Sequence, residues 1–130
     1  MKFFIAFAAL VVAASALTPE RKAEVDAIGQ ECLTSSGVER PKVADLRKGV
    51  FADDDNLKKF ISCVFIKTGG MNADGTFNKE TIKKDFGERK EVLDAALLCT
   101  DSHGATVDET AYLAYKCFRT NAPTDYKPNW

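Results

Sequence analysis

Residues 54–70 read DDNLKKFISCVFIKTGG, and this stretch decides the fold. Its apolar side chains recur every three or four residues, which predicts one helix with a broad hydrophobic face. These residues are Leu57, Phe60, Ile61, Val64 and Phe65. Because Cys63 and Ile66 widen the face, we expect the helix to be covered on several sides and to form the centre of the protein.

Further helices are predicted around this one. Thr18-Pro19-Glu20 places a hydroxyl N-cap, a proline and an acidic side chain in the order that begins a helix. Asn78 is a second N-cap, and Thr106 begins a capping box. The expected ranges, including the central helix, are 18–35, 41–49, 54–70, 78–87, 88–101 and 106–121. No segment predicts a strand, so the expected fold class is all-α, with about six short helices in one domain.

The N-terminus predicts a secretory signal peptide. Lys2 is followed by an apolar run and then by Ala14-Ser15-Ala16, which is a typical cleavage pattern. The run is too short to span a bilayer. We therefore expect residues 1–16 to be removed and residues 17–130 to form a single soluble, extracellular domain.

Two segments outside the expected helices have distinctive sequences. Residues 71–77, MNADGTF, contain an N-x-D-G pattern, but a calcium loop in that register would have Gly70 and Thr81 where carboxylates are required. We interpret the segment as a turn.

The C-terminal tail carries two prolines together with Tyr126 and Trp130. We expect it either to lie across the body of the protein or to fray.

The four cysteines, Cys32, Cys63, Cys99 and Cys117, all follow the signal peptide. An even number of cysteines in an oxidising compartment predicts two disulfides. Metal binding is disfavoured, because no pair has C-x-x-C spacing and His103 is the single histidine. Four cysteines can pair in three ways, and their spacing alone does not choose among them.

Charge and motif content argue against several functions. The formal net charge of -1 gives no reason to expect nucleic-acid binding or a polybasic membrane anchor. The sequence has no G-x-S-x-G, H-E-x-x-H or glycine-rich phosphate motif. We interpret His103 as a solvated loop residue, so no enzyme activity and no cofactor are expected. A small hydrolase is the weakest of the alternatives.

The chain is rich in aromatic residues from Val50 onward. Several short helices that cross at different angles can leave an unfilled apolar centre, which would bind an apolar small molecule. A fully packed core fits the same pattern. The periodicity leaves these two alternatives open.

Three motifs resemble insect odorant-binding proteins over nearly all of the chain after the signal peptide. They are CVFIKTG at 63–69, the Asp74-Gly75 turn, and AYLAYKC at 111–117. That family usually has six cysteines, and two of the six positions are occupied here by Lys59 and Asp108. The chain therefore resembles the four-cysteine C-minus branch of the family.

The resemblance implies the pairs Cys32 with Cys63 and Cys99 with Cys117, and a hypothetical ion pair between Lys59 and Asp108. It also implies a secreted carrier, in sensillar lymph or haemolymph, for an odorant, pheromone or fatty-acid-like lipid, with a chemosensory receptor as a further partner. Tyr112 or Tyr115 would bond to a polar group of the ligand. The expected lining is Leu57, Phe60, Ile61, Val64, Phe65, Met71, Phe77, Ile82, Phe86, Leu93, Leu97, Tyr112, Tyr115 and Phe118. The alternative is a disulfide-stapled interaction protein with a packed core.

Overall fold

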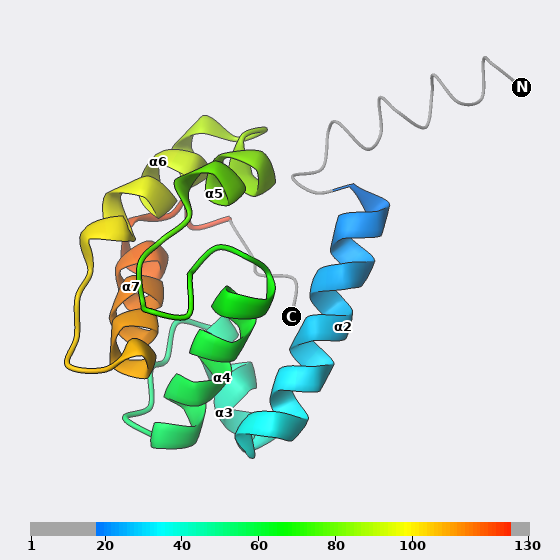
Figure 1. Cartoon of the computed structure of the whole chain (residues 1–130), viewed down its shortest axis with the longest axis vertical. Coiled ribbons are helices and arrows are strands. Elements are labelled where there is room, and N and C mark those ends of the chain that lie inside the picture. The colour runs from blue at the N-terminus through cyan, green and yellow to red at the C-terminus, as the bar shows by residue number, and fades with distance from the viewer. Residues whose placement is uncertain (1–17, 126–130) are drawn as a thin grey trace, which may run out of the picture.

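A computed structural model of the protein describes residues 18–125 (Figure 1). The expected signal peptide at residues 1–16 lies outside the described residues, as do Tyr126 and Trp130 of the tail. Within the described part of the chain the fold is all-α, as predicted. The helices are α2 (Pro19–Ser36), α3 (Arg40–Arg47), α4 (Asp55–Lys67), α5 (Lys79–Phe86), α6 (Lys90–Leu98) and α7 (Val107–Asn121), and the 3-10 turn η1 (Cys99–Asp101) follows α6.

Side-chain caps fix where several of these helices begin. The Thr18 side chain accepts a hydrogen bond from the Arg21 amide at 3.1 Å, and Thr106 does the same for Glu109 at 3.0 Å. Asp54 accepts from the Leu57 amide at 2.9 Å at the start of α4. Each cap satisfies an amide that has no partner inside its helix. These bonds are local, which is why the sequence predicts the starting residues well.

The region expected as one helix at 88–101 is shorter and ends differently. Arg89 has an extended backbone, with φ -123° and ψ 108°, so α6 begins only at Lys90. After Leu98 the chain tightens into η1. A short 3-10 turn of this kind is common at the end of an α-helix, where the last carbonyl groups lack partners.

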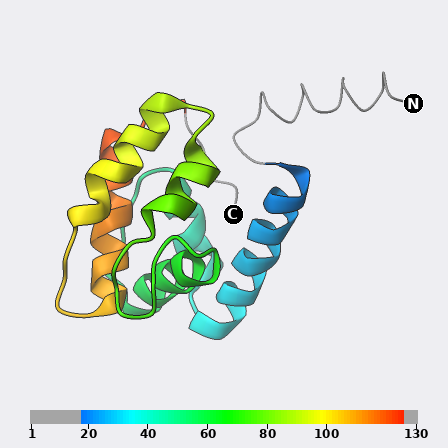
Figure 2. The same ribbon diagram turned by 45° about the horizontal axis from the view of Figure 1, so that its top comes forward.

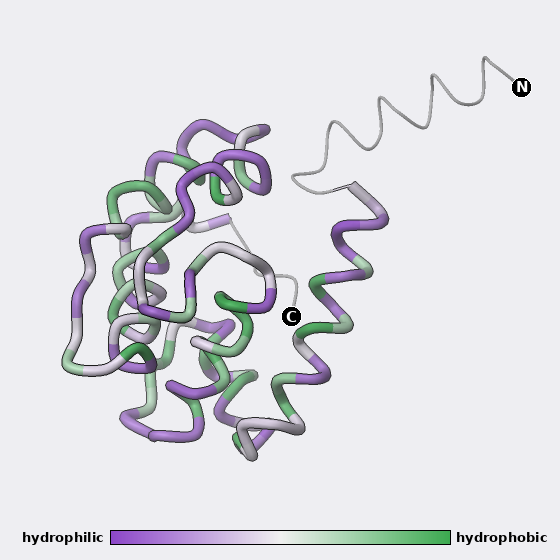
Figure 3. Tube along the Cα trace, viewed as in Figure 1, coloured by the Kyte–Doolittle hydropathy of each residue, from purple (hydrophilic) through white to green (hydrophobic). Residues whose placement is uncertain are grey.

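Helix α4 forms the centre of the fold, as the sequence predicted. It packs mainly against α2 on one side and α7 on the other, while α5 and α6 pack together at one end of the molecule (Figures 1 and 2). Leu57, Phe60, Ile61 and Val64 of α4 are at most 2% exposed. In contrast, α5 is hydrophilic along most of its length (Figure 3), and Ile82 is its buried residue.

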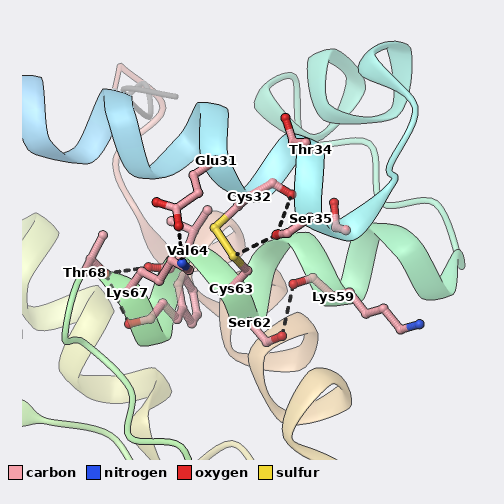
Figure 4. The surroundings of a disulfide bond; sticks show 12 residues. Glu31, Cys32, Thr34, Ser35, Lys59, Ser62, Cys63, Val64, Lys67 and Thr68 are labelled. Atoms are coloured by element: carbon pink, nitrogen blue, oxygen red, sulfur yellow. Dashed lines mark hydrogen bonds and ion pairs between the residues drawn. A yellow bond between two sulfur atoms is a disulfide. The ribbon is translucent and has the colours of Figure 1, made fainter.

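Two disulfides hold this arrangement together, in the pairing that the resemblance implied. Cys32 is bonded to Cys63, which joins the C-terminal part of α2 to α4 (Figure 4). Cys99 is bonded to Cys117, which joins η1 to α7. All four cysteines are therefore oxidised.

The hypothetical ion pair between Lys59 and Asp108 is wrong. Lys59 is exposed, and its side chain extends away from Ser62 (Figure 4). The Asp108 carboxylate instead accepts a hydrogen bond from the Ser62 hydroxyl, which also lies 3.1 Å from the Lys59 carbonyl oxygen. Ser62 thus lies between the Lys59 carbonyl group and the Asp108 carboxylate, while the Lys59 side chain is directed toward solvent.

The neighbouring lysine, Lys58, forms the charged link between α4 and α7. Its ammonium lies 2.9 Å from a carboxylate oxygen of Glu109 and 2.9 Å from one of Asp53, and 5.0 Å from the centre of the Tyr112 ring. The hydrogen bonds with Asp53 and Glu109 raise the pKa of Lys58 well above its ordinary value. Noncovalent bonds therefore join α4 and α7 beside Lys59 and Asp108.

Candidate ligand-binding cavity

A mainly apolar cavity of about 130 Å³ lies at the end of α4 that is nearest to α5. It is bounded by α2, α4, α5, α6, η1, α7 and the loop that precedes α5. Its lining consists of Val25, Val64, Phe65, Thr68, Gly70, Phe77, Thr81, Ile82, Asp85, Phe86, Ala96, Cys99, Ala114, Tyr115 and Phe118.

Aromatic side chains from three helices form much of the wall. The rings of Phe86 in α5 and Phe118 in α7 are 5.7 Å apart between centroids. Tyr115 lies 6.4 Å from Phe118 and 6.3 Å from Phe65 of α4. These distances are typical of aromatic packing. The rings contact one another around the cavity and so hold its shape.

Small residues leave the space that these rings do not fill. Ala96 of α6 and Ala114 of α7 line the cavity, as does Gly70 after α4. None of the three has side-chain atoms beyond Cβ, so each ends short of the centre. Because protein interiors are otherwise closely packed, an apolar space of this kind is a candidate binding site.

One end of the cavity is polar. Asp85 of α5 lies there, and its carboxylate is paired with Arg21 of α2: Nε donates to Oδ1 at 3.0 Å and Nη2 donates to Oδ2 at 2.7 Å. Nη2 also donates to the Thr68 carbonyl oxygen at 2.6 Å, and Nη1 donates to Glu24. We call this set of bonds the Arg21 clasp. The hydrogen bond with Asp85 is the main cause of a raised pKa of Arg21.

The Arg21 clasp joins three elements at this end of the cavity. Its paired contact with Asp85 is a two-bond geometry that arginine and carboxylate form especially well. The side chains of Arg21 and Asp85 are 21% and 16% exposed, so the pair is partly shielded from water. The clasp therefore links the first turn of α2 to α5 and to the C-terminal end of α4.

Of the fourteen residues predicted to bind ligand, the structure brings half together around the cavity. Those are Val64, Phe65, Phe77, Ile82, Phe86, Tyr115 and Phe118. The other seven, which do not line it, are Leu57, Phe60, Ile61, Met71, Leu93, Leu97 and Tyr112.

The seven residues outside the lining fall into two groups. Leu57, Phe60, Ile61 and Met71 are at most 1% exposed in the core, and Tyr112 is also buried with its hydroxyl 3.4 Å from the Phe51 carbonyl oxygen. Leu93 and Leu97 are half-buried on α6. They were predicted from helix faces and from family position, which identify inward-facing residues but do not separate packed core from cavity.

Part of the lining was not predicted from the sequence. Val25 shares one face of the first helix with Ile28 and Cys32, which is a usable signal. The polar residues Thr68, Thr81 and Asp85 gave no signal, because the pattern selected apolar side chains. The remaining missed residues, Gly70, Ala96, Cys99 and Ala114, contribute through small size or through the disulfide.

The size of the cavity sets what it holds in this conformation. An apolar cavity of about 150 Å³ is large enough to bind benzene in another protein. This cavity is close to that size, so it matches a small apolar molecule or part of a longer aliphatic chain. Among residues 18–125, no group of His, Cys, Asp and Glu is placed to hold a metal ion, and no helix is long and apolar enough to cross a membrane.

Comparison with known sequences places this cavity in a family context. The PBP/GOBP family matches residues 14–121. The B1 protein of Tenebrio molitor is 29% identical over 121 residues, covering 88% of this chain and 90% of the relative. Odorant-binding protein 10 of Aedes aegypti is 28% identical, covering 75% of this chain and 73% of the relative.

Two solved structures share the fold. An odorant binding protein of Locusta migratoria superposes with a TM-score of 0.70 at 22% identity, covering 77% of this chain and 80% of that one. A fatty acid binding protein from the oral disk of the blowfly Phormia regina gives a TM-score of 0.65 at 28% identity, covering 81% and 94%. The chain belongs to the PBP/GOBP family of insect odorant-binding proteins, and its four cysteines are consistent with the C-minus branch.

Proposed function

We propose that this member of the PBP/GOBP family is a secreted carrier that encloses one small hydrophobic molecule and releases it unchanged. The candidate ligands are odorants, pheromones and fatty-acid-like lipids. The observation that carries the proposal is the aromatic-lined cavity between α4, α5 and α7. Removing apolar ligand surface from water contributes roughly 25 cal/mol per Å², so a lining of this composition is sufficient to retain such a molecule.

Secretion and partners belong to the same proposal. The N-terminal pattern predicts export, and two disulfides suit an oxidising extracellular fluid. Sensillar lymph and haemolymph are both such fluids. A chemosensory receptor is the further partner that an olfactory role would require.

Uptake of a fluorescent apolar probe tests the proposal. The oxidised protein should bind about one probe per chain, and aliphatic alcohols should displace it. Ala96→Phe should reduce uptake at least tenfold, because the added ring occupies the cavity. Ala44→Phe is the matched control, since Ala44 is exposed on α3 and the same ring there should leave uptake unchanged.

The same experiment distinguishes the carrier from the alternative, an interaction protein with a packed core. Circular dichroism and thermal melting should first show that each variant is folded. If folded wild-type protein takes up no apolar probe, the carrier is contradicted. A secreted interaction protein that acts through its surface would then be favoured.

A further inference from the structure

The polar end of the cavity indicates which polar group the ligand has. Of the lining residues, Asp85 is the charged one, and Thr68 and Thr81 are the neighbouring polar ones. The rest of the lining is formed by apolar or small residues. An amphiphilic ligand therefore lies with its hydrocarbon part against Tyr115 and Phe118 and its polar group toward Asp85.

The arginine at this end has little capacity left for an anionic ligand. The Arg21 guanidinium donates twice to Asp85, once to the Thr68 carbonyl oxygen and once to Glu24. All but one of its N–H donors are therefore used. A ligand carboxylate would have to displace Asp85 from Arg21 in order to form the two-bond contact that arginine normally offers.

The charge balance points the same way. Within the Arg21 clasp, one guanidinium faces two carboxylates, those of Asp85 and Glu24. Glu24 is 58% exposed and well screened by water, whereas Asp85 is 16% exposed and lines the cavity. A ligand carboxylate beside Asp85 would meet a like charge in a partly shielded site, which disfavours its ionised form.

Asp85 nevertheless has acceptor capacity for a neutral ligand. Each of its carboxylate oxygens accepts one bond from Arg21, and an ionised carboxylate has further lone-pair positions. A ligand hydroxyl has a proton to donate to one of them. Such a bond to a charged acceptor is stronger than one between neutral groups.

We propose that the Arg21 clasp makes the cavity selective for aliphatic alcohols over carboxylates of the same chain length, with Asp85 as the specificity-determining residue. This inference rests on the proposed carrier function and narrows its ligand class. The proposed preference for alcohols differs from the ligand class in the name of the Phormia regina protein, which is called a fatty acid binding protein. The shared fold thus does not imply a shared headgroup.

Paired ligands test the selectivity in the wild-type protein without any substitution. At pH 7, where octanoate is ionised, 1-octanol should displace the fluorescent probe at a concentration at least tenfold lower than octanoate does. Tenfold corresponds to one pKa unit of like-charge interaction. Equal displacement, or stronger displacement by octanoate, overturns the inference and leaves the carrier function intact. Probe uptake with no displacement by either ligand also overturns the inference, and absence of probe uptake overturns the carrier function itself.

Asp85→Asn tests the residue. This variant keeps the side-chain shape, removes the like charge and frees the guanidinium of Arg21, so octanoate should bind about tenfold more tightly while 1-octanol changes less. Glu31→Gln is the matched control. Glu31 is an exposed α2 carboxylate paired with Lys67 of α4 (Figure 4); it does not line the cavity, and its loss changes the net charge equally. A folded Asp85→Asn protein with an unchanged octanol-to-octanoate ratio would overturn the role of Asp85.

Discussion

The two ends of α2 are held in different ways. Near its C-terminal end, Cys32 is fully buried and covalently bonded to Cys63 of α4. In its first turn, Arg21 is bonded to Asp85 and to the Thr68 carbonyl oxygen. The first link does not open while the protein stays oxidised, whereas the second consists of hydrogen bonds that can break and re-form.

This difference bears on how the cavity opens. Val25 of α2 lines the cavity and lies between the two ends, one turn beyond Arg21. Movement of α2 about its disulfide-bonded end would lift Val25 and the Arg21 clasp away from α5 together. The comparison therefore assigns a fixed end and a releasable end to the same helix. Exchange of the cysteines and of Arg21 tests this description directly, and two further changes concern the neighbouring contacts of α4.

Cys32→Ala with Cys63→Ala should have the largest effect, because it removes the covalent end. The bond joins residues separated by 31 positions, and closing a loop of that length contributes about 3–4 kcal/mol. We expect the free energy of unfolding, measured in urea, to fall by that amount. Hydrogen exchange should also accelerate along the whole of α2.

The control for this change is Cys99→Ala with Cys117→Ala, whose bond spans 18 positions away from α2. It should lower the free energy of unfolding by about 3 kcal/mol. Hydrogen exchange in α2 should nevertheless stay slower than in the first variant. Equal acceleration of α2 in both variants would argue against a fixed end at Cys32.

Lys59→Cys with Asp108→Cys should add a second covalent link to α4, this time from α7. The Ser62 hydroxyl is bonded both to the Lys59 carbonyl oxygen and to the Asp108 carboxylate, so the two positions lie close together, and the shorter cysteine side chains test whether their Cβ atoms are directed toward each other. A new disulfide should raise the free energy of unfolding by about 2–3 kcal/mol, less than the loop length alone would give, because engineered disulfides often distort the native geometry. Thiol titration and thermal melting with and without reductant measure it, and Lys59→Ser with Asp108→Ser is the control. Two titratable thiols after air oxidation would show that these positions do not face each other.

Arg21→Gln should loosen the releasable end. It removes the hydrogen bonds with Asp85 and leaves a partly shielded carboxylate without its cation. We therefore expect the free energy of unfolding to fall by about 1–2 kcal/mol. Hydrogen exchange should accelerate in residues 19–28 and change little in residues 29–36. Lys67→Gln is the control, because it breaks the more exposed ion pair with Glu31. It should lower the free energy of unfolding by at most about 1 kcal/mol. Uniform acceleration along α2 would contradict the two-ended description.

Asp54→Asn should have the smallest effect, and one that depends on pH. The hydrogen bond from Lys42 and that from the Leu57 amide lower the pKa of Asp54 below its ordinary value of 3.8. A carboxyl group whose pKa is lower in the folded state stabilises the protein above its unfolded-state pKa and loses this contribution as the pH falls through the folded-state pKa.

The stability difference between wild type and Asp54→Asn should therefore be largest near neutral pH and shrink as the pH falls below about 4. Urea unfolding at several pH values measures this difference. The disulfide end of α2 does not titrate, so its contribution should persist over the same range. A difference that stays constant with pH would contradict the role assigned to Asp54.

Local features of the sequence predicted the helices well. Thr18, Asn78 and Thr106 each cap the helix that follows, and each bond spans only three residues. The broad apolar face around Phe60 placed α4 at the centre. The disulfide pairing needed more than local pattern, because three pairings were possible and only the family resemblance chose between them.

The cavity was harder to predict because it depends on contacts between distant segments. Phe60 and Val64 share one face of α4, yet Phe60 packs in the core while Val64 lines the cavity. Arg21 and Asp85 are separated by 64 positions, and no periodicity connects them. At Lys59, the predicted ion pair failed because the sequence could not give the direction of the side chain.

The two disulfides also affect how the chain oxidises as it is made. Cys32–Cys63 and Cys99–Cys117 close successive loops that do not overlap. A chain that crosses into an oxidising compartment from its N-terminus presents Cys32 and Cys63 before either of the others. At that moment the native pair is the sole pair that can form, so the order of synthesis selects the native pairing.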